Sequence, residues 1–362
     1  MNGSKLRTPL TELVGIEHPI VQTGMGWVAG PRLVAATAQA GGLGILASAT
    51  MTFPELEAAI TKTTSLTDRP FGVNLRADAA DAPERIDLLI RENVRVASFA
   101  LAPEKELIAR LKDAGVVVIP SIGAAKHAVK VAAWGADAVI VQGGEGGGHT
   151  GPVATTLLLP SVLDAVDIPV VAAGGFFDGR GLAAALSYGA AGVAMGTRFL
   201  LTQESTVPDA VKREYLARGL ADTVVSTKVD GMPHRMLNTE LVERLEHSGD
   251  WRGLSAAVAN AARFKSMTGM KWSTLVRDGL SLRRTKDLTW SQVVMAANSA
   301  MLTKAALVEG RTDAGVLPAG QVTGIIDNLP TVAELINQII GDALIRIDAI
   351  AALASGNPTE RH

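Results

Sequence analysis

One histidine in a glycine-rich stretch is the residue of this chain best suited to do chemistry. Between Val139 and Gly151 the sequence reads VIVQGGEGGGHTG, where five of the six positions before His149 are glycine and the sixth is Glu145. Glycine lets a backbone adopt positive φ and approach a ligand closely, at an entropic cost on folding. An imidazole can act as a general base near physiological pH. We therefore predict a loop in which His149 takes a proton from a bound substrate.

Other uses of this loop stay open at the level of sequence. His149 could bond only to backbone, although the surrounding glycines favour proton transfer. A metal ion is not expected, because Glu145 lies four residues back in a loop and no second histidine is close in the sequence. Glu145 either orients the loop by accepting amide hydrogen bonds or is solvated. The remaining histidines are expected to be structural or solvated: His18, His127, His234, His247 and His362.

Strand-like and helix-like stretches alternate over the first two hundred residues. The expected strands are Pro19–Thr23, Leu43–Ser48, Phe71–Leu75, Arg95–Ala100, Val116–Ser121, Ala138–Gln142, Pro169–Ala173 and Gly192–Gly196. The expected helices are Pro31–Ala40, Pro54–Thr63, Pro83–Glu92, Glu104–Asp113, Ala124–Trp134, Leu157–Val166 and Gly179–Tyr188. Apolar strands that alternate with helices indicate a parallel sheet covered on both faces. Eight of them favour a closed (β/α)8 barrel over a doubly wound open sheet.

The alternation ends after Leu201, and the next hundred residues are helical in tendency and richer in charge. A closing helix is expected only later, over Gln321–Asp327 and then Leu329–Ala354. The sequence therefore predicts a barrel made of residues 1–207 and 306–354. A helical insertion, 208–305, is expected to cover the C-terminal face of the barrel, where sites lie in this fold. Residues 355–362 are expected to form a flexible tail.

Composition narrows the range of functions. The 362 residues carry a net charge of −2, which argues against a general nucleic-acid binder. The absence of cysteine excludes disulfides, thiolate metal sites and a cysteine nucleophile. The N-terminus lacks a secretory apolar region, and no apolar run approaches the roughly 18 residues of a membrane span. We expect a cytoplasmic protein with no membrane partner, and the oligomeric state stays open, a homodimer included.

Two successive strands end in small residues: a pair of glycines follows the first, and a glycine and a threonine follow the second. AAGGF places Gly174 and Gly175 just past one strand, and AMGTRF places Gly196 and Thr197 past the next. In barrels that bind phosphate these two loops form the cradle, with amides and a helix N-terminus facing the anion. The pattern favours a phosphate-bearing cofactor over ordinary turns, although a sugar-phosphate isomerase or lyase would share it. Such enzymes usually need a lysine or paired carboxylates at strand ends, and no lysine lies at one here.

Two earlier strand ends could flank a planar ring. In QTGMGWVAGP the backbone of Gly24, Met25 and Gly26 follows the first strand, and in GVNL the amide of Asn74 ends the third. Each signal is weak alone, because an asparagine that ends a strand is usually a cap or turn residue.

Taken in order, QTGMG, AGGLGI, GVN, QGGEGGGHTG, AAGGFFDGRG, GVAMGTRFL and AGQVTGII resemble the nitronate monooxygenase (2-nitropropane dioxygenase) family, which includes flavin-dependent enoyl-acyl-carrier-protein reductases. The resemblance covers about two thirds of the chain and implies a (β/α)8 barrel that holds non-covalent FMN. It implies that His149 is the family's base. One departure is Gly146, where the family usually has alanine. The residues implied to contact FMN are Gly24, Met25, Gly26, Asn74, Gln142 and Gly148 at the ring, Gly174, Gly175, Gly196 and Thr197 at the phosphate, and Gln321 on the C-terminal side.

Within the family, the chain is similar to actinobacterial members of steroid degradation. That resemblance implies dehydrogenation of a bicyclic acyl-coenzyme A thioester, with His149 as base and flavin N5 as hydride acceptor. The same motifs fit two other reactions: oxidation of alkyl nitronates with O2, and reduction of an enoyl thioester with NAD(P)H. The electron acceptor, O2 or NAD(P), is left open. A binding module without turnover is the rival from another class.

A basic cluster lies inside the predicted insertion, among residues 263–286. Its last members, Arg283, Arg284 and Lys286, could bind the phosphates of coenzyme A. The alternative is a solvated helix face, which is the more common use of a run of charges.

Overall fold

Eight parallel strands close into a barrel, as the sequence predicts. The computed structural model describes residues 6–100, 103–247 and 290–355. In the last of these ranges, side chains are described from residue 299 onward. Neighbouring strands pair in the order β1-β2-β3-β4-β5-β6-β8-β9, and β9 pairs with β1 to complete the ring. The strands are β1 (Ile20–Gln22), β2 (Leu43–Ala47), β3 (Phe71–Leu75), β4 (Val96–Phe99), β5 (Val117–Ile122), β6 (Val139–Gln142), β8 (Val170–Ala173) and β9 (Gly192–Met195).

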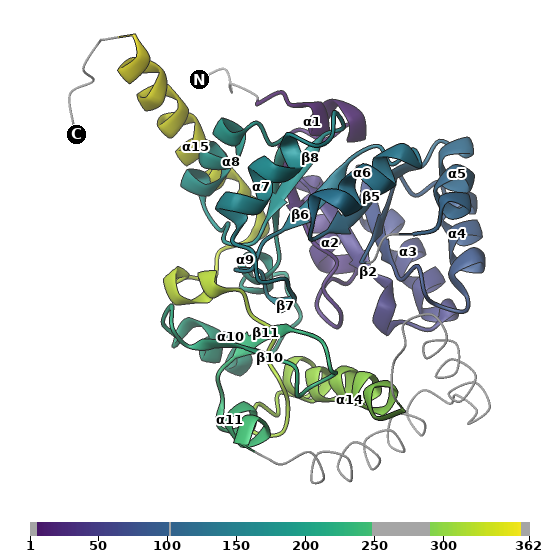
Figure 1. Cartoon of the computed structure of the whole chain (residues 1–362), viewed down its shortest axis with the longest axis vertical. Helices are drawn as coiled ribbons and strands as arrows, with labels where there is room; N and C mark the ends of the chain where they lie inside the picture. The colour runs from purple at the N-terminus through teal and green to yellow at the C-terminus, as the bar shows by residue number, and fades with distance from the viewer. Residues whose placement is uncertain (1–5, 101–102, 248–289, 356–362) are drawn as a thin grey trace.

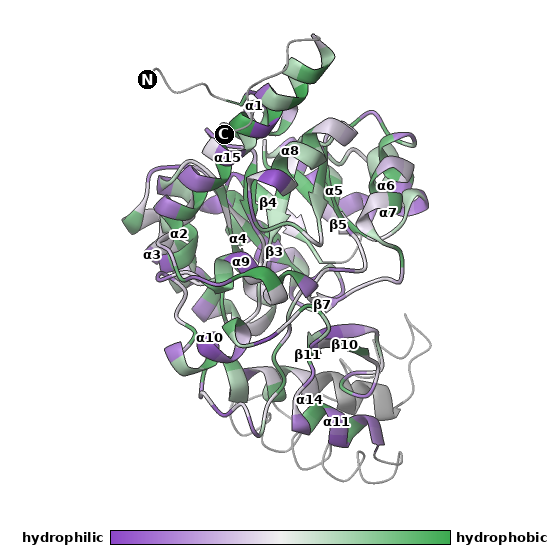
Figure 2. Ribbon diagram, turned by 90° about the vertical axis from the view of Figure 1, so that its left-hand side faces the viewer, coloured by the Kyte–Doolittle hydropathy of each residue, from purple (hydrophilic) through white to green (hydrophobic). Residues whose placement is uncertain are grey.

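Helices surround the strands, and each strand is therefore buried on both faces (Figure 2). In β6, for example, Ile140 packs inside the barrel, whereas Val139 and Val141 pack against the helices. This two-sided burial explains why the strands are apolar throughout rather than alternating. The surrounding helices are α2 (Pro31–Gln39), α3 (Phe53–Leu66), α4 (Ala82–Arg91), α5 (Lys105–Asp113), α6 (Ala125–Ala133), α7 (Thr155–Leu163), α8 (Gly179–Tyr188) and α15 (Val332–Ala354), with the 3-10 turn η1 (Ser48–Thr50) after β2.

A short helix, α1 (Pro9–Val14), packs against the N-terminal end of the barrel. Its Leu10 and Val14 belong to the same apolar cluster as the interior residues of the strands. The helix begins at a Thr8 capping box and ends at Gly15, whose φ of 85° is left-handed. The N-terminal end of the barrel interior is thus covered by α1.

The segment that follows the last barrel strand forms a cap beside the strand C-termini (Figure 1). The sequence predicts only helices here, but the cap also contains two strands: β10 pairs with β11, and β11 pairs with β7 (Gly148–His149) of the glycine-rich loop. Each strand has four residues or fewer, and β7 lies far from its partner β11 in the sequence, so the local pattern does not reveal this sheet. The short helix α9 (Thr197–Leu200) follows β9 directly. The described elements of the cap are α10 (Asp209–Leu216), β10 (Thr223–Ser226), β11 (His234–Leu237), α11 (Glu240–His247) and α14 (Trp290–Leu307).

The closing helix begins later in the chain than the sequence predicts. Residues Gln321–Ile325 form a 3-10 turn, η2, and α15 begins only at Val332 after the Thr331 capping box. The helix packs mainly on α8, where the backbone of Ala343 approaches Gly179 closely. Among the described residues, no helix combines the length and apolar character needed to cross a bilayer.

Candidate active site

The glycine-rich loop between β6 and α7 is held in one conformation by hydrogen bonds. Glu145 accepts from the Thr155 backbone N–H at 3.0 Å and from the Thr155 hydroxyl at 2.8 Å. Gln142 donates from Nε2 to the carbonyl of His149 at 2.8 Å. Of the two sequence readings of Glu145, the structure supports the one in which this carboxylate orients the loop. These bonds offset the entropy lost by ordering so many glycines.

His149 lies at the edge of the barrel mouth and contacts the cap. Its backbone pairs with His234 of β11, and the Thr150 N–H donates to the Pro233 carbonyl at 3.1 Å. The His149 side chain is 53% exposed, and its Nε2 lies 2.7 Å from Oδ2 of Asp230. One side of the imidazole is thus held by the cap, and the rest is open for a substrate.

Asp230 is a buried carboxylate shared between two histidines. Its side chain is 3% exposed, and Nδ1 of His234 lies 3.5 Å from the same Oδ2, at ion-pair distance but without hydrogen-bond geometry. The rings of His149 and His234 are 4.8 Å apart, centroid to centroid. Burial raises the pKa of the Asp230 carboxyl, but the hydrogen bond with His149 and the charges of both histidines outweigh it and hold this pKa well below its ordinary range. Asp230 is therefore ionised.

The donor atoms of these three residues all lie within 4.8 Å of one another, which is close enough to consider a metal ion. No second histidine is close to His149 in the sequence, but the fold brings His234 beside it, so the sequence argument against a metal ion does not carry over to the structure. The distance between His149 and Asp230 nevertheless suits a direct hydrogen bond better than a shared metal ion. Two ligands of a tetrahedral zinc lie about 3.3 Å apart for bonds near 2.0 Å, whereas Nε2 of His149 and Oδ2 of Asp230 are at 2.7 Å.

The residues expected beside a planar ring lie together at the ends of β1 and β3. A Cβ on Gly24 would lie 2.5 Å from Cβ of Asn74, so only glycine allows this approach. The Asn74 amide donates to the Ser98 hydroxyl at 3.3 Å. Beneath them Gln22 is fully buried, and its Oε1 has no hydrogen-bond partner in the described structure. An orphaned acceptor of this kind fits a polar group that arrives with a ligand.

The residues expected at a phosphate follow β8 and β9. Gly174 and Gly175 both have positive φ, 92° and 85°, which turns the chain sharply at the end of β8. Gly196 precedes α9 and approaches the Met25 sulfur. The Thr197 hydroxyl accepts the backbone N–H of Gly320 at 2.9 Å. Because β8 and β9 pair with each other, these four positions follow neighbouring strands; their role at a phosphate stays a prediction.

The other predicted residues either contact the glycine-rich loop or lie outside the described residues. The Gln321 N–H donates to the Glu145 carbonyl at 3.0 Å, which ties η2 to the glycine-rich loop. The Gln142 side chain is engaged by the loop itself, and Gly148 pairs with Arg235 of β11. The basic residues Arg283, Arg284 and Lys286 fall outside the described residues.

Sequence reasoning missed Asp230, and it assigned His234 no part in the site. Both belong to the stretch DGMPH, whose glycine and proline signal a turn within the segment that we expected to be helical. Arg235 was also missed. Its guanidinium donates to the Gly144 carbonyl at 3.0 Å and to the Thr223 hydroxyl at 3.0 Å, which fixes the loop to the cap.

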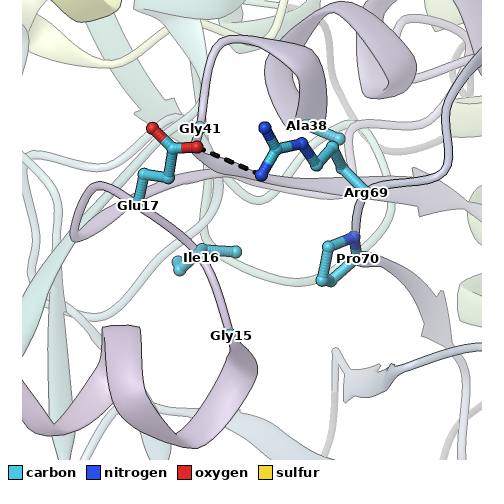
Figure 3. A pocket seen from close by; sticks show the side chains of 7 residues that line it. All are labelled: Gly15, Ile16, Glu17, Ala38, Gly41, Arg69 and Pro70. Carbon is cyan, nitrogen blue, oxygen red and sulfur yellow. Dashed lines mark ion pairs between the residues drawn. The ribbon is translucent and has the colours of Figure 1, made fainter.

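A shallow depression elsewhere does not compete with this site. It is lined by Gly15, Ile16, Glu17, Ala38, Gly41, Arg69 and Pro70, with Glu17 and Arg69 forming an ion pair at 3.1 Å (Figure 3). These residues precede β1, β2 and β3, on the N-terminal face of the barrel. In this fold that face contributes to stability, and catalytic residues lie at the opposite face. Its 170 Å³ of empty space includes open solvent and is below the roughly 300–1,000 Å³ of ligand pockets.

Comparison with known proteins agrees with this geometry. The family model described as nitronate monooxygenase matches residues 7–86 and 80–342. A Rhodococcus jostii protein, "(3aS,4S,5R,7aS)-5-hydroxy-7a-methyl-1-oxo-octahydro-1H-indene-4-carboxyl-CoA dehydrogenase", is 78% identical over 97% of this chain and 99% of its own. A Mycobacterium tuberculosis protein of the same name is 72% identical over 96% and 99%. The solved structure of FabK from Thermotoga maritima has a TM-score of 0.78 at 33% identity and covers 96% of this chain and 99% of its own. The chain belongs to the nitronate monooxygenase family of oxidoreductases.

Proposed function

We propose that this chain is an FMN-dependent dehydrogenase of a bicyclic acyl-coenzyme A thioester. The observation that carries the proposal is the identity of 78% and 72% to two dehydrogenases of such a thioester, over nearly the full length of each chain. The barrel mouth supports it, since it presents an accessible His149 next to the residues expected to bind a flavin.

The residues at the mouth fit FMN. The close approach of Gly24 to Asn74 and the orphaned Oε1 of buried Gln22 suit the edge of a polar ring. The positive φ of Gly174 and Gly175 suits a turn whose amides face a phosphate. When bound, the flavin supplies an acceptor for two electrons and a proton. A single phosphate cradle, at β8 and β9, favours FMN over a dinucleotide.

The role we assign to His149 follows from its exposure and its partner. A carbon adjacent to a thioester carbonyl is weakly acidic, and removal of its proton prepares the neighbouring carbon to lose hydride. His149 takes this proton with the ring nitrogen that faces the mouth. The ionised Asp230 then stabilises the imidazolium that forms.

We also propose that residues 208–305 act as a substrate cap on a barrel of 1–207 and 306–354. The described part of α14 supports this assignment, because the Lys304 ammonium lies 5.2 Å from the ring centroid of Trp27, in the loop after β1. The coenzyme A clamp of Arg283, Arg284 and Lys286 stays a prediction from sequence.

The test is an anaerobic half-reaction of the purified, flavin-loaded protein. The bicyclic acyl-coenzyme A should bleach the flavin absorbance, and propionate-3-nitronate should not. His149→Ala should slow bleaching by about 10²–10⁴-fold, and His127→Ala, an exposed histidine on α6, should leave the rate unchanged. Bleaching by the nitronate alone would refute the substrate assignment, and full activity of His149→Ala would refute the base. A cofactor other than FMN, released on denaturation, would refute the cofactor assignment.

A further inference from the structure

We propose that Asp230 is a positioning residue for His149 and that it makes Nδ1, rather than Nε2, the atom that accepts the substrate proton. This inference rests on the proposed role of His149 as base. It assigns a function to a cap residue that lies 81 positions away in the sequence.

The first support is the geometry of the pair. Nε2 of His149 lies 2.7 Å from Oδ2 of Asp230, the distance of a charge-assisted hydrogen bond. The carboxylate is itself fixed, since its other oxygen, Oδ1, accepts the Met232 backbone N–H at 3.1 Å. The pairing of β7 with β11 sets the distance between the two segments. The imidazole therefore has one preferred orientation before any substrate binds.

The second support is the charge of the partner. An ionised carboxylate only accepts hydrogen bonds, so the hydrogen between the two atoms belongs to Nε2. The same interaction holds the pKa of Asp230 low. A neutral imidazole carries one N–H, and the lone pair is then on Nδ1. Within the described structure Nδ1 makes no hydrogen bond, and the His149 side chain is 53% exposed. The free lone pair is on the nitrogen that can meet a substrate.

The neighbouring charged groups do not compete with Asp230 for the N–H of His149. Glu145 is occupied by Thr155, and the Arg235 guanidinium donates to Gly144 and Thr223. His234 is the one other titratable group that faces Asp230 among the described residues. It is buried, and its ring nitrogens make no hydrogen bond. Its Nδ1 is 3.5 Å from Oδ2, too long to replace His149 as the partner of Asp230.

The kinetic test compares three variants with the flavin-loaded wild type. In Asp230→Asn the amide can donate to Nε2 and so favour the wrong tautomer, and we expect kcat to fall about 10²–10⁴-fold with KM nearly unchanged. Asp230→Glu keeps the negative charge and should recover part of kcat. The matched control is Asp222→Asn, in the same cap, whose carboxylate accepts the exposed Gly219 N–H and, among the described residues, no other hydrogen bond. Wild-type kcat in Asp230→Asn, with His149→Ala inactive, would overturn the inference and leave the proposed function standing.

The direct test reads the tautomer without turnover. In the flavin-loaded protein labelled with ¹⁵N-histidine, the His149 resonances, assigned by their loss in His149→Ala, should be those of the Nε2–H form. In Asp230→Asn the Nδ1–H form should appear. An Nδ1–H form in the wild type would overturn the inference. So would one equivalent of bound zinc that is lost in Asp230→Asn, because the three residues would then be metal ligands.

Discussion

At Gly146 the glycine-rich loop has no room for a side chain while Gln142 holds its present position. A Cβ on Gly146 would lie 2.6 Å from Nε2 of Gln142, the atom that donates to the His149 carbonyl. The contacted atoms belong to a flexible side chain, so Gly146→Ala should displace Gln142 and leave the fold intact. We expect the loss of that bond, worth about 1 kcal/mol, to lower kcat/KM roughly fivefold.

The matched control for this prediction is Gly151→Ala, in the same loop. A Cβ there would meet nothing within 4 Å, so steady-state kinetics should be close to wild type. If Gly146→Ala were fully active while Gln142→Ala was impaired, the proposed conflict between residue 146 and Gln142 would be wrong.

Individual residues of the site could be predicted from sequence only where they share a local motif. His149 and its glycines form one uninterrupted stretch. The sequence left Glu145 open between a loop-orienting and a solvated role, and only its hydrogen bonds to Thr155 in the structure distinguish the two. Asp230 is beyond such reasoning, since its contact with His149 exists only after the cap strands pair with β7. A lone aspartate in a turn carries no chemical signal of its own.

Between elements, the hydroxyl of Thr197 joins the last barrel strand to the turn before η2. It accepts the Gly320 N–H at 2.9 Å in a buried setting. Thr197→Val keeps the shape of the side chain but leaves that N–H unpaired, which should lower the free energy of unfolding by about 1–3 kcal/mol. Thr197→Ser retains the acceptor and should lose less. Chemical denaturation of the flavin-loaded and flavin-free proteins measures both effects, and equal losses in the two variants would contradict this role.

At the scale of elements, the sequence was most informative where burial is two-sided. All eight barrel strands were predicted within one or two residues, because parallel strands covered on both faces are continuous apolar runs bounded by glycine or proline. The helix α1 and the sheet β10-β11-β7 were not predicted. Strands such as Thr223–Ser226 are short and partly exposed, and the third strand of this sheet, β7, is part of a glycine-rich loop with no strand propensity of its own.

For the whole molecule, the two ends of the barrel are closed by different means. At the N-terminal end α1 packs apolar side chains against the interior residues of the barrel strands. At the C-terminal end the cap comes from a separate stretch of chain and contacts the barrel through His149, Arg235 and Lys304. Substitutions in α1 should therefore affect stability, whereas substitutions at the cap contacts should affect the site.

The packing of α15 against α8, on the outside of the barrel, can be tested with two glycines whose substitution should have opposite effects on stability. A Cβ on Gly179 would lie 2.4 Å from the backbone N of Ala343, so Gly179→Ala should push the helices apart and destabilise the fold by about 1–3 kcal/mol. Gly341, inside α15, would place a Cβ in open space. Gly341→Ala should therefore stabilise the protein by about 0.5–1 kcal/mol through helix propensity alone. Thermal unfolding should show the melting temperature falling for the first variant and rising for the second. A rise for both would mean that the contact between α8 and α15 is looser than described.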